Sequence, residues 1–108
     1  MMRIGIDLGG TTVKAALCRE DGTLLHKMNA PTRLGDADGL RADMKVLALA
    51  LCEKEAITPE QVQSIGIGVP GSFDKETCTL RFGTNLDMSD VCFAQAFEPE
   101  FQCAVQLD

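Results

Sequence analysis

Short apolar runs separated by turn residues make up the first thirty positions of the chain. Arg3–Leu8 is apolar and is followed by Gly9-Gly10, a pattern that predicts a buried strand. Val13–Cys18 and Thr23–Ala30 predict two further strands, and Asp21-Gly22 between them signals a hairpin because both residues tolerate positive φ. The chain is therefore predicted to open as a three-stranded antiparallel meander with a glycine-rich turn between its first two strands.

A stripe of apolar residues with helical spacing follows the predicted meander. A helix is expected from about Asp38 to Ala56, with Asp36 or Asp38 as its cap. Its apolar residues recur at steps of four, three and four, as on the buried face of a helix, at Leu40, Met44, Leu47 and Leu51.

The second half of the chain predicts more strands with less regular segments between them. Thr58–Gln61 has the residues of a short capped helical turn, and Gln63–Val69 alternates apolar residues as a strand does. Ser72–Gly83 predicts an irregular excursion or a second hairpin. A helix is expected from about Asp90 to Phe97 and a final strand over Cys103–Leu107. Three antiparallel strands followed by helix-linked strands predict an α/β fold with a mixed sheet.

The glycine-rich turn carries the clearest candidate chemistry, although a plain hairpin is the simpler alternative. Phosphate chains are bound by convergent backbone N–H groups, and glycine lets the backbone approach them closely. Threonine hydroxyls and a lysine add donors and positive charge, and a carboxylate at a strand end can hold hydrated Mg²⁺. The candidate phosphate-binding residues are Gly9, Gly10, Thr11, Thr12 and Lys14, and Asp7 is the candidate Mg²⁺ ligand through water.

A second glycine-rich segment, Gly66–Gly71, fits the dinucleotide pattern Gly-x-Gly-x-x-Gly. We reject that interpretation because the first two glycines lie inside a predicted strand and no amphipathic helix follows Pro70. Gly66 and Gly68 instead indicate a strand that another element or a ligand approaches closely.

Composition narrows the class of protein. The 108 residues, 45% hydrophobic and 24% charged, suit one soluble domain, and no apolar run approaches the ~20 residues that span a membrane. The net charge of −6 disfavours nucleic-acid binding, and Asp7 comes too early for a signal peptide. Five cysteines without a Cys-x-x-Cys pair indicate free thiols in the cytoplasm, with neither zinc nor a disulfide framework within these residues.

Three motifs in order resemble one family. The Asp7–Thr11 loop is similar to that of the hexokinase, actin and Hsp70 chaperone superfamily. With Lys14, Gly68–Gly71 and Asn85-Leu86 in register, the chain resembles the ROK family of repressors and sugar kinases. The resemblance implies a ribonuclease-H-like, actin-like ATPase fold in two lobes, with residues 1–108 as the N-terminal lobe. It also implies ATP- and Mg²⁺-dependent phosphorylation of a hexose or an amino sugar.

The resemblance also assigns candidate sugar residues. It implies that Gly71 presents backbone groups to the sugar and that the side-chain amide of Asn85, which both donates and accepts, binds a sugar hydroxyl. Plain turns at Pro70-Gly71 and Thr84-Asn85 are the alternatives. Many family members have a tryptophan shortly after the Asn-Leu pair, where this chain has Asp87-Met88, so the sugar is left open, with glucose as the default.

The catalytic base is expected outside these residues. The family places it in an Asn-Asp pair after the strand that Cys103–Leu107 resembles, and Asp108 fits the residue before that pair. The zinc-binding motif and the second lobe would also lie downstream. The isolated chain is therefore expected to be inactive as a kinase, and its exposed apolar surface could drive homo-oligomer formation.

Two other functions compete with the kinase. A sugar-sensing ROK regulator would carry a DNA-binding helix-turn-helix before the loop, for which Met1–Ile6 leaves no room. A structural or regulatory ATPase closer to actin would have no required role for Gly71 or Asn85. Sugar binding therefore discriminates between these readings.

Overall fold

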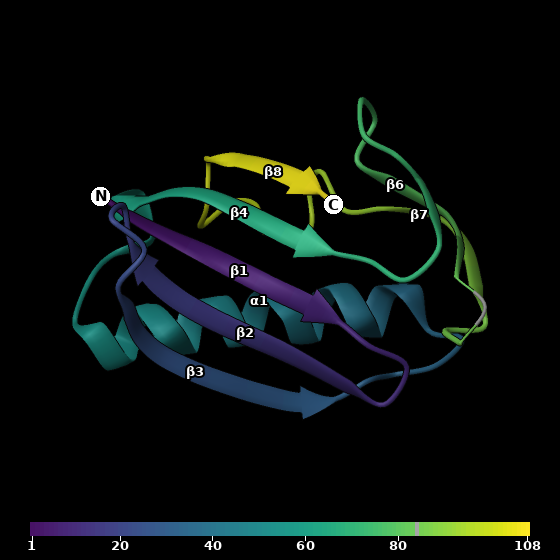
Figure 1. Ribbon diagram of the computed structural model, residues 1–108, viewed down its shortest axis with the longest axis horizontal. Coiled ribbons are helices and arrows are strands. Elements are labelled where there is room, and N and C mark those ends of the chain that lie inside the picture. The colour runs from purple at the N-terminus through teal and green to yellow at the C-terminus, as the bar shows by residue number, and fades with distance from the viewer. Residues whose placement is uncertain (84) are drawn as a thin grey trace.

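The computed structural model describes residues 1–83 and 85–108 and consists of two sheets and one long helix (Figure 1). The larger sheet has five strands in the order β3-β2-β1-β4-β8, and the smaller has three in the order β5-β6-β7. The elements are β1 (Met2–Leu8), β2 (Thr12–Arg19), β3 (Leu24–Pro31), α1 (Ala37–Glu55), the 3₁₀ helix η1 (Pro59–Gln61), β4 (Val62–Gly68), β5 (Ser72–Asp74), β6 (Thr79–Gly83), β7 (Met88–Cys92) and β8 (Ala104–Leu107).

The predicted meander and its mixed continuation are confirmed. β1 pairs antiparallel with β2 and β2 with β3, whereas β4 pairs parallel with β1 and β8 parallel with β4. Gly22, at φ +93°, closes the predicted hairpin between β2 and β3 with an N–H bond to the carbonyl of Arg19. The result is an α/β fold with a mixed sheet, as the sequence predicts.

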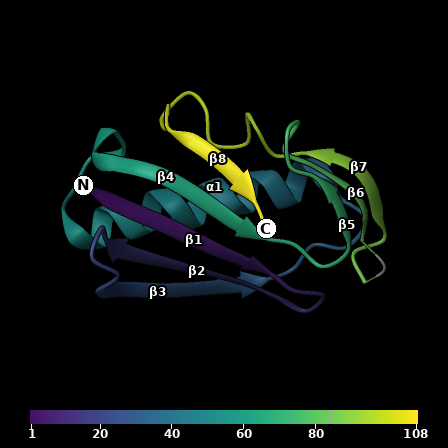
Figure 2. The same ribbon diagram turned by 45° about the horizontal axis from the view of Figure 1, so that its top comes forward.

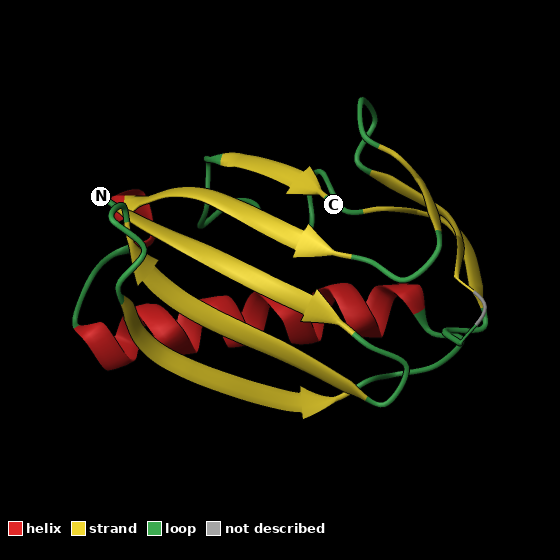
Figure 3. Ribbon diagram, in the orientation of Figure 1, coloured by secondary structure: helices red, strands yellow, loops and turns green. Residues whose placement is uncertain are grey.

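The main core lies between the large sheet and α1, which runs across one face of it (Figure 3). All four residues of the predicted apolar stripe are buried, and they pack with alternate residues of β1, β2 and β4, among them Ile6, Val13, Ile65 and Ile67. Asp36, one of the two predicted caps, accepts a hydrogen bond from the N–H of Gly39 at 2.9 Å. Because one face of each strand is buried here, the alternate side chains of β1 and β2 face away from α1.

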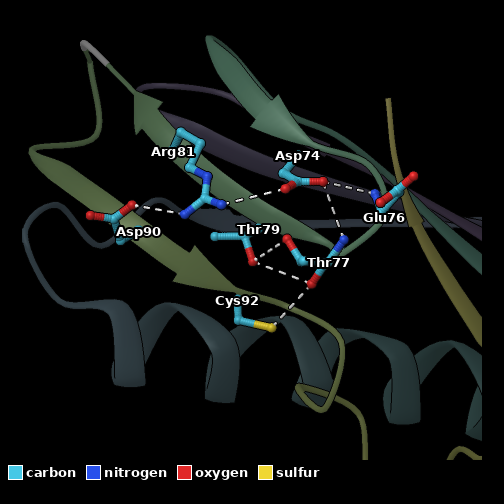
Figure 4. Close-up of polar contacts among 7 residues, drawn as sticks. All are labelled: Asp74, Glu76, Thr77, Thr79, Arg81, Asp90 and Cys92. Atoms are coloured by element: carbon cyan, nitrogen blue, oxygen red, sulfur yellow. Dashed lines mark hydrogen bonds and ion pairs between the residues drawn. The ribbon is translucent and has the colours of Figure 1, made fainter.

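The small sheet lies at the end of the large sheet where β1 and β4 finish (Figure 2). Of the two alternatives for Ser72–Gly83, the structure has the hairpin, β5 with β6, and adds β7. Arg81 lies between two carboxylates, 3.4 Å from Asp74 and 3.4 Å from Asp90, and so links all three strands (Figure 4).

The predicted helix from Asp90 to Phe97 is wrong. Met88–Cys92 forms β7 instead, because Val91 lies opposite the buried Leu80 of β6, and Asp90 has φ +55°, which no α-helix residue adopts. The residues after β7 form turns anchored by three buried aromatic side chains, Phe93, Phe97 and Phe101.

Candidate functional site

Asp7 and Lys14 face each other across β1 and β2 on the sheet face that α1 leaves open. They line a groove of about 740 Å³ together with Gly68 and Asp108. A Cβ built on Gly68 would lie 3.9 Å from Oδ1 of Asp7, so the absence of a side chain there leaves room beside the carboxylate. A hard, oxygen-preferring cation with its waters fits such a place, because its usual protein ligand is a carboxylate.

The turn between β1 and β2 uses its carbonyl groups within the protein. The N–H of Gly9 donates to the carbonyl of Thr12 at 3.1 Å, and the carbonyl of Thr11 accepts from the N–H of Thr32 at 3.0 Å. The hydroxyl of Thr32 donates to the carbonyl of Gly9 at 2.8 Å. Three carbonyls of the turn are thus occupied by internal donors, one of which is the N–H of Gly9, so neither these oxygens nor that N–H is offered to a ligand. The candidate anion-binding groups that remain are the other N–H groups of the turn and the hydroxyls of Thr11 and Thr12.

Gly10 brings the turn between β1 and β2, the candidate phosphate loop, against Asn85, the candidate sugar residue. A Cβ built on Gly10 would lie 3.0 Å from the Cβ of Asn85 and 3.8 Å from its Cγ. Any other residue at position 10 would push the Asn85 side chain away. Glycine is therefore needed here for close approach to a side chain of the protein. The approach to a phosphate, for which the sequence argument invoked glycine, stays a prediction.

Gly71 is fixed by its backbone and by its neighbours. Its φ is +122°, and a Cβ there would meet the carbonyl group of Phe82 and lie 3.3 Å from Gly83. The Pro70-Gly71 turn therefore packs on the end of β6, two residues before Asn85. Asn85 itself lies in a turn and is exposed, and Thr84 lies outside the described residues.

Asp108 follows β8 at the same end of the sheet. Its N–H donates to the carbonyl of Ile67 at 2.8 Å, and its carbonyl accepts from the N–H of Val69 at 3.0 Å. The backbone of Asp108 is thus held beside the end of β4, and its carboxylate lies 3.6 Å from Lys75. A residue that directly follows Asp108 would begin next to the groove that Asp7 lines.

The structure thus gathers the candidates at one end of the sheet in two adjoining groups. Asp7, Lys14 and Asp108 line the groove, whereas Gly10, Gly71 and Asn85 belong to the loop and turn beside it. Two residues that pattern reasoning missed, Thr32 and Gly35, bond to the loop and to the Asn85 turn of the second group. The sequence signal that could have found Gly35 is a glycine directly before the helix cap Asp36, a place where the chain often needs a positive φ. In the structure the φ of Gly35 is +66°, which favours glycine.

Several other features of the described residues are not candidates for a functional site. Within the described residues, no group of three or more His, Cys, Asp or Glu side chains is placed to hold a metal ion. The single histidine, His26, bonds Glu55 at 2.9 Å and joins β3 to the end of α1, so it has a packing role. No helix in the described part of the chain is long and apolar enough to cross a membrane.

Comparison with solved structures identifies the fold. The chain superimposes over its full length on a ROK family glucokinase from Streptomyces griseus, solved with glucose and AMPPNP, with a TM-score of 0.83, 24% identity and 33% of that chain covered. The fold is therefore that of an actin-like ATPase lobe.

Sequence similarity makes the assignment more specific. Residues 3–108 match the ROK family, to which this chain belongs. A glucokinase from Thermotoga maritima is 37% identical over 84 residues, 76% of this chain and 25% of the relative. A xylose repressor from Caldicellulosiruptor bescii is 30% identical over 106 residues, 97% of this chain and 27% of the relative. The chain thus spans about a quarter of the length of these relatives.

Proposed function

We propose that this chain is the N-terminal lobe of an ATP-dependent ROK sugar kinase, which transfers the γ-phosphoryl group of ATP to a hydroxyl of a hexose or amino sugar in the cytoplasm. The observation that carries the proposal is the contact between Gly10 of the phosphate loop and Asn85. Phosphoryl transfer depends on holding donor and acceptor together, and this contact sets the two candidate sites directly side by side.

The loop residues would hold the nucleotide. The N–H groups of Gly10, Thr11 and Thr12 and the hydroxyls of the two threonines would bind the phosphate chain, and Lys14 would add positive charge. Gly9, predicted to be a further donor, has its N–H bonded to the carbonyl of Thr12, so its part would be to shape the turn. The carboxylate of Asp7, with the free space over Gly68 beside it, would hold Mg²⁺ through water. Bound magnesium would neutralise negative charge on the phosphates. The loop residues and Asp7 would hold the phosphates and the ion in fixed positions for the transfer.

The sugar would lie on the other side of the Gly10 contact. The amide of Asn85 can donate to and accept from a sugar hydroxyl. Gly71, at φ +122°, lies against Phe82 and Gly83 at the end of β6, and its backbone groups would contact the sugar from there. Support comes from the resemblance, because the S. griseus glucokinase was solved with glucose and a nucleotide analogue. Glucose is accordingly the first sugar to test.

The proton acceptor for the sugar hydroxyl would follow Asp108. Because the Asp108 backbone is bonded to Ile67 and Val69, the residues that follow it would lie at the edge of the groove lined by Asp7, and a carboxylate among them would face that groove. Because base and closing lobe are both needed for transfer, the 108-residue chain by itself is expected to show no kinase activity.

The test is a coupled ATP-consumption assay on the longer protein that carries this lobe, beside the 108-residue chain. A panel of hexoses and amino sugars is supplied in turn. We expect one sugar to stimulate turnover in the longer protein, none in the short chain, and loss of turnover in the Asp7→Ala variant. Turnover by the short chain above its own Asp7→Ala control would overturn its expected inactivity.

A ROK regulator is the second candidate, favoured by the similarity to a xylose repressor over 97% of this chain. A regulator would bind a sugar, detected by calorimetry with glucose and xylose, without sugar-dependent ATP consumption. If no sugar is bound or phosphorylated, both candidates fail and a non-kinase actin-like ATPase becomes the better account.

A further inference from the structure

The segment Thr32–Gly35, here named the strap, joins the end of β3 to the cap of α1 and touches the phosphate loop with its first residue. Thr32 makes two hydrogen bonds to the loop, from its hydroxyl to the carbonyl of Gly9 at 2.8 Å and from its N–H to the carbonyl of Thr11 at 3.0 Å. A single residue therefore holds the loop on both sides of Gly10.

The last residue of the strap touches the turn that carries Asn85. The N–H of Gly35 donates to the carbonyl of Leu86 at 2.9 Å, and a Cβ on Gly35 would lie 3.1 Å from Oδ2 of Asp87. Leu86 is fully buried, and its N–H donates to the carbonyl of Gly83 at 3.1 Å. The strap is therefore anchored to a buried point of the turn rather than to a loose surface loop.

The strap and the Gly10 contact close a ring of interactions. The phosphate loop touches Asn85 through Gly10, Asn85 is followed by Leu86, Leu86 is bonded to Gly35, and Thr32 returns to the loop. A shift of any member must be taken up by the others, because close-packed groups have no free space in which to relax.

The strap is also fixed to α1. The guanidinium of Arg33 donates to the carboxylate of Asp43 at 2.7 Å, and Asp36 directly after the strap caps the helix. The first turns of a 19-residue helix are thereby tied to Arg33 inside the strap and to Asp36 directly after it, so the strap has a rigid support.

We propose that Thr32 is a positioning residue for phosphoryl transfer and that the strap sets the separation of the phosphate loop from Asn85. The proposal rests on the proposed kinase function. Both hydrogen bonds of Thr32 go to carbonyls of the loop, those of Gly9 and Thr11, and neither goes to an N–H group or a hydroxyl that would bind the nucleotide, or to Asn85. Thr32 therefore acts through the loop.

Removing the Thr32 hydroxyl should therefore affect turnover more than sugar binding. In Thr32→Val the shape is kept while the bond to Gly9 is lost, and misplacing reacting groups by a fraction of an ångström lowers kcat. We expect kcat to fall about tenfold with the sugar KM within about twofold of the parent value. Thr32→Ser keeps the hydroxyl and is expected to restore kcat to within about threefold.

Thr79→Val is the matched control. It removes a hydroxyl that also donates to a backbone carbonyl, that of Thr77 at 3.2 Å, but in the small sheet (Figure 4). We expect it to leave both kcat and KM unchanged. The assay uses the longer protein with the sugar that it turns over, at saturating ATP.

A second measurement does not depend on activity. Hydrogen exchange of the same variants, followed by mass spectrometry, reports the amide of Gly35, which is bonded in the ring, and that of Leu86, which is bonded to Gly83 in the adjoining turn. Thr32→Val should accelerate exchange at both amides, whereas Thr32→Ser and Thr79→Val should not.

The outcomes separate this inference from the proposed function. If the parent protein is active and Thr32→Val keeps its kcat, the positioning role of Thr32 is wrong while the kinase stands. If no sugar is turned over, the kinase proposal fails. Faster exchange in Thr32→Val would then still support the coupling of loop and turn, and unchanged exchange would overturn it.

Discussion

A Cβ on Gly10 would lie 3.0 Å from the Cβ of Asn85, so the phosphate loop and the Asn85 turn are in direct contact through a position without a side chain. The two residues are far apart in sequence, and they lie in connections between strands of different sheets, Gly10 between β1 and β2 and Asn85 between β6 and β7. Because of this contact the two motifs form one surface. The effects of changing residues in and around it can be measured in the 108-residue chain itself.

Replacing Gly10 by alanine should displace the Asn85 side chain. The backbone of Gly10 is not in the left-handed region, so the added methyl group meets only the crowding at Asn85. We expect the side-chain amide signals of Asn85 to shift in two-dimensional NMR spectra of the isotope-labelled chain. Gly5→Ala is the control, since no atom lies within 4 Å of a Cβ there, and Asn85 signals that stay in place in both variants would contradict the contact.

Gly71→Ala should destabilise the fold. At φ +122° an L residue is strained, and the added Cβ would also meet the carbonyl of Phe82. We expect a loss of about 2 kcal/mol or more in the free energy of unfolding, measured by urea denaturation. Gly66→Ala, in β4 with open space at its Cβ, should be neutral or stabilising by up to about 1 kcal/mol. Equal stability of the two variants would argue against strain at Gly71.

Acid should weaken the small sheet. In the folded chain the backbone N–H of Thr77 lowers the pKa of Asp74, with further lowering by the N–H of Glu76 and by Arg81 (Figure 4). A carboxyl whose pKa is lowered by folding stabilises the fold above its unfolded pKa, near about 3.9 for aspartate. That stabilisation is lost as the pH falls through the lower, folded pKa.

The measurement is the urea midpoint from neutral pH to about pH 2.5. Asp74→Asn should lower the midpoint at neutral pH and reduce its decline in acid, because the variant has no carboxyl to protonate. Glu76→Gln, which removes the same charge from an exposed residue two positions away, should follow the parent curve. An Asp74→Asn curve with the parent's slope would show that Asp74 is not a source of the acid sensitivity.

The cysteines should react with maleimide in a defined order. Cys92 is exposed, whereas Cys52 and Cys78 are buried, and burial raises the pKa of both buried thiols. A higher pKa means less reactive thiolate at pH 7.5. We expect Cys92 to be labelled first, and Cys52 and Cys78 only in urea, by mass spectrometry of digested protein. A Cys92→Ser variant should lack the fast phase, and rapid labelling of Cys78 in native protein would contradict its burial.

The large sheet and α1 could be predicted from sequence because their signals are local. The stripe Leu40, Met44, Leu47 and Leu51 repeats with the helix period, and Asp21-Gly22 is a hairpin turn wherever two strands flank it. The family motifs placed the candidate residues at one end of the sheet, although their individual ligands are still predictions.

Non-local pairing explains what the sequence could not show. Phe93 and Phe97 are four residues apart, as on one face of a helix, yet the segment that carries them forms turns, and both side chains are buried. The rings of Phe97 and Phe101 pack edge to face, with their centres 6.2 Å apart. β7 forms because Val91 meets Leu80, a pairing set by β6 rather than by local preference. Thr32 was missed for the same reason, since its two acceptors lie more than twenty residues earlier.

The strap also has an evolutionary consequence. Surface loops usually tolerate insertions. An added residue in Thr32–Gly35 would instead pull Thr32 off the loop carbonyls or Gly35 off Leu86. Among descendants that keep the contact between the loop and the Asn85 turn, this four-residue stretch is therefore expected to keep its length, with sequence changes concentrated at Leu34, whose side chain is exposed.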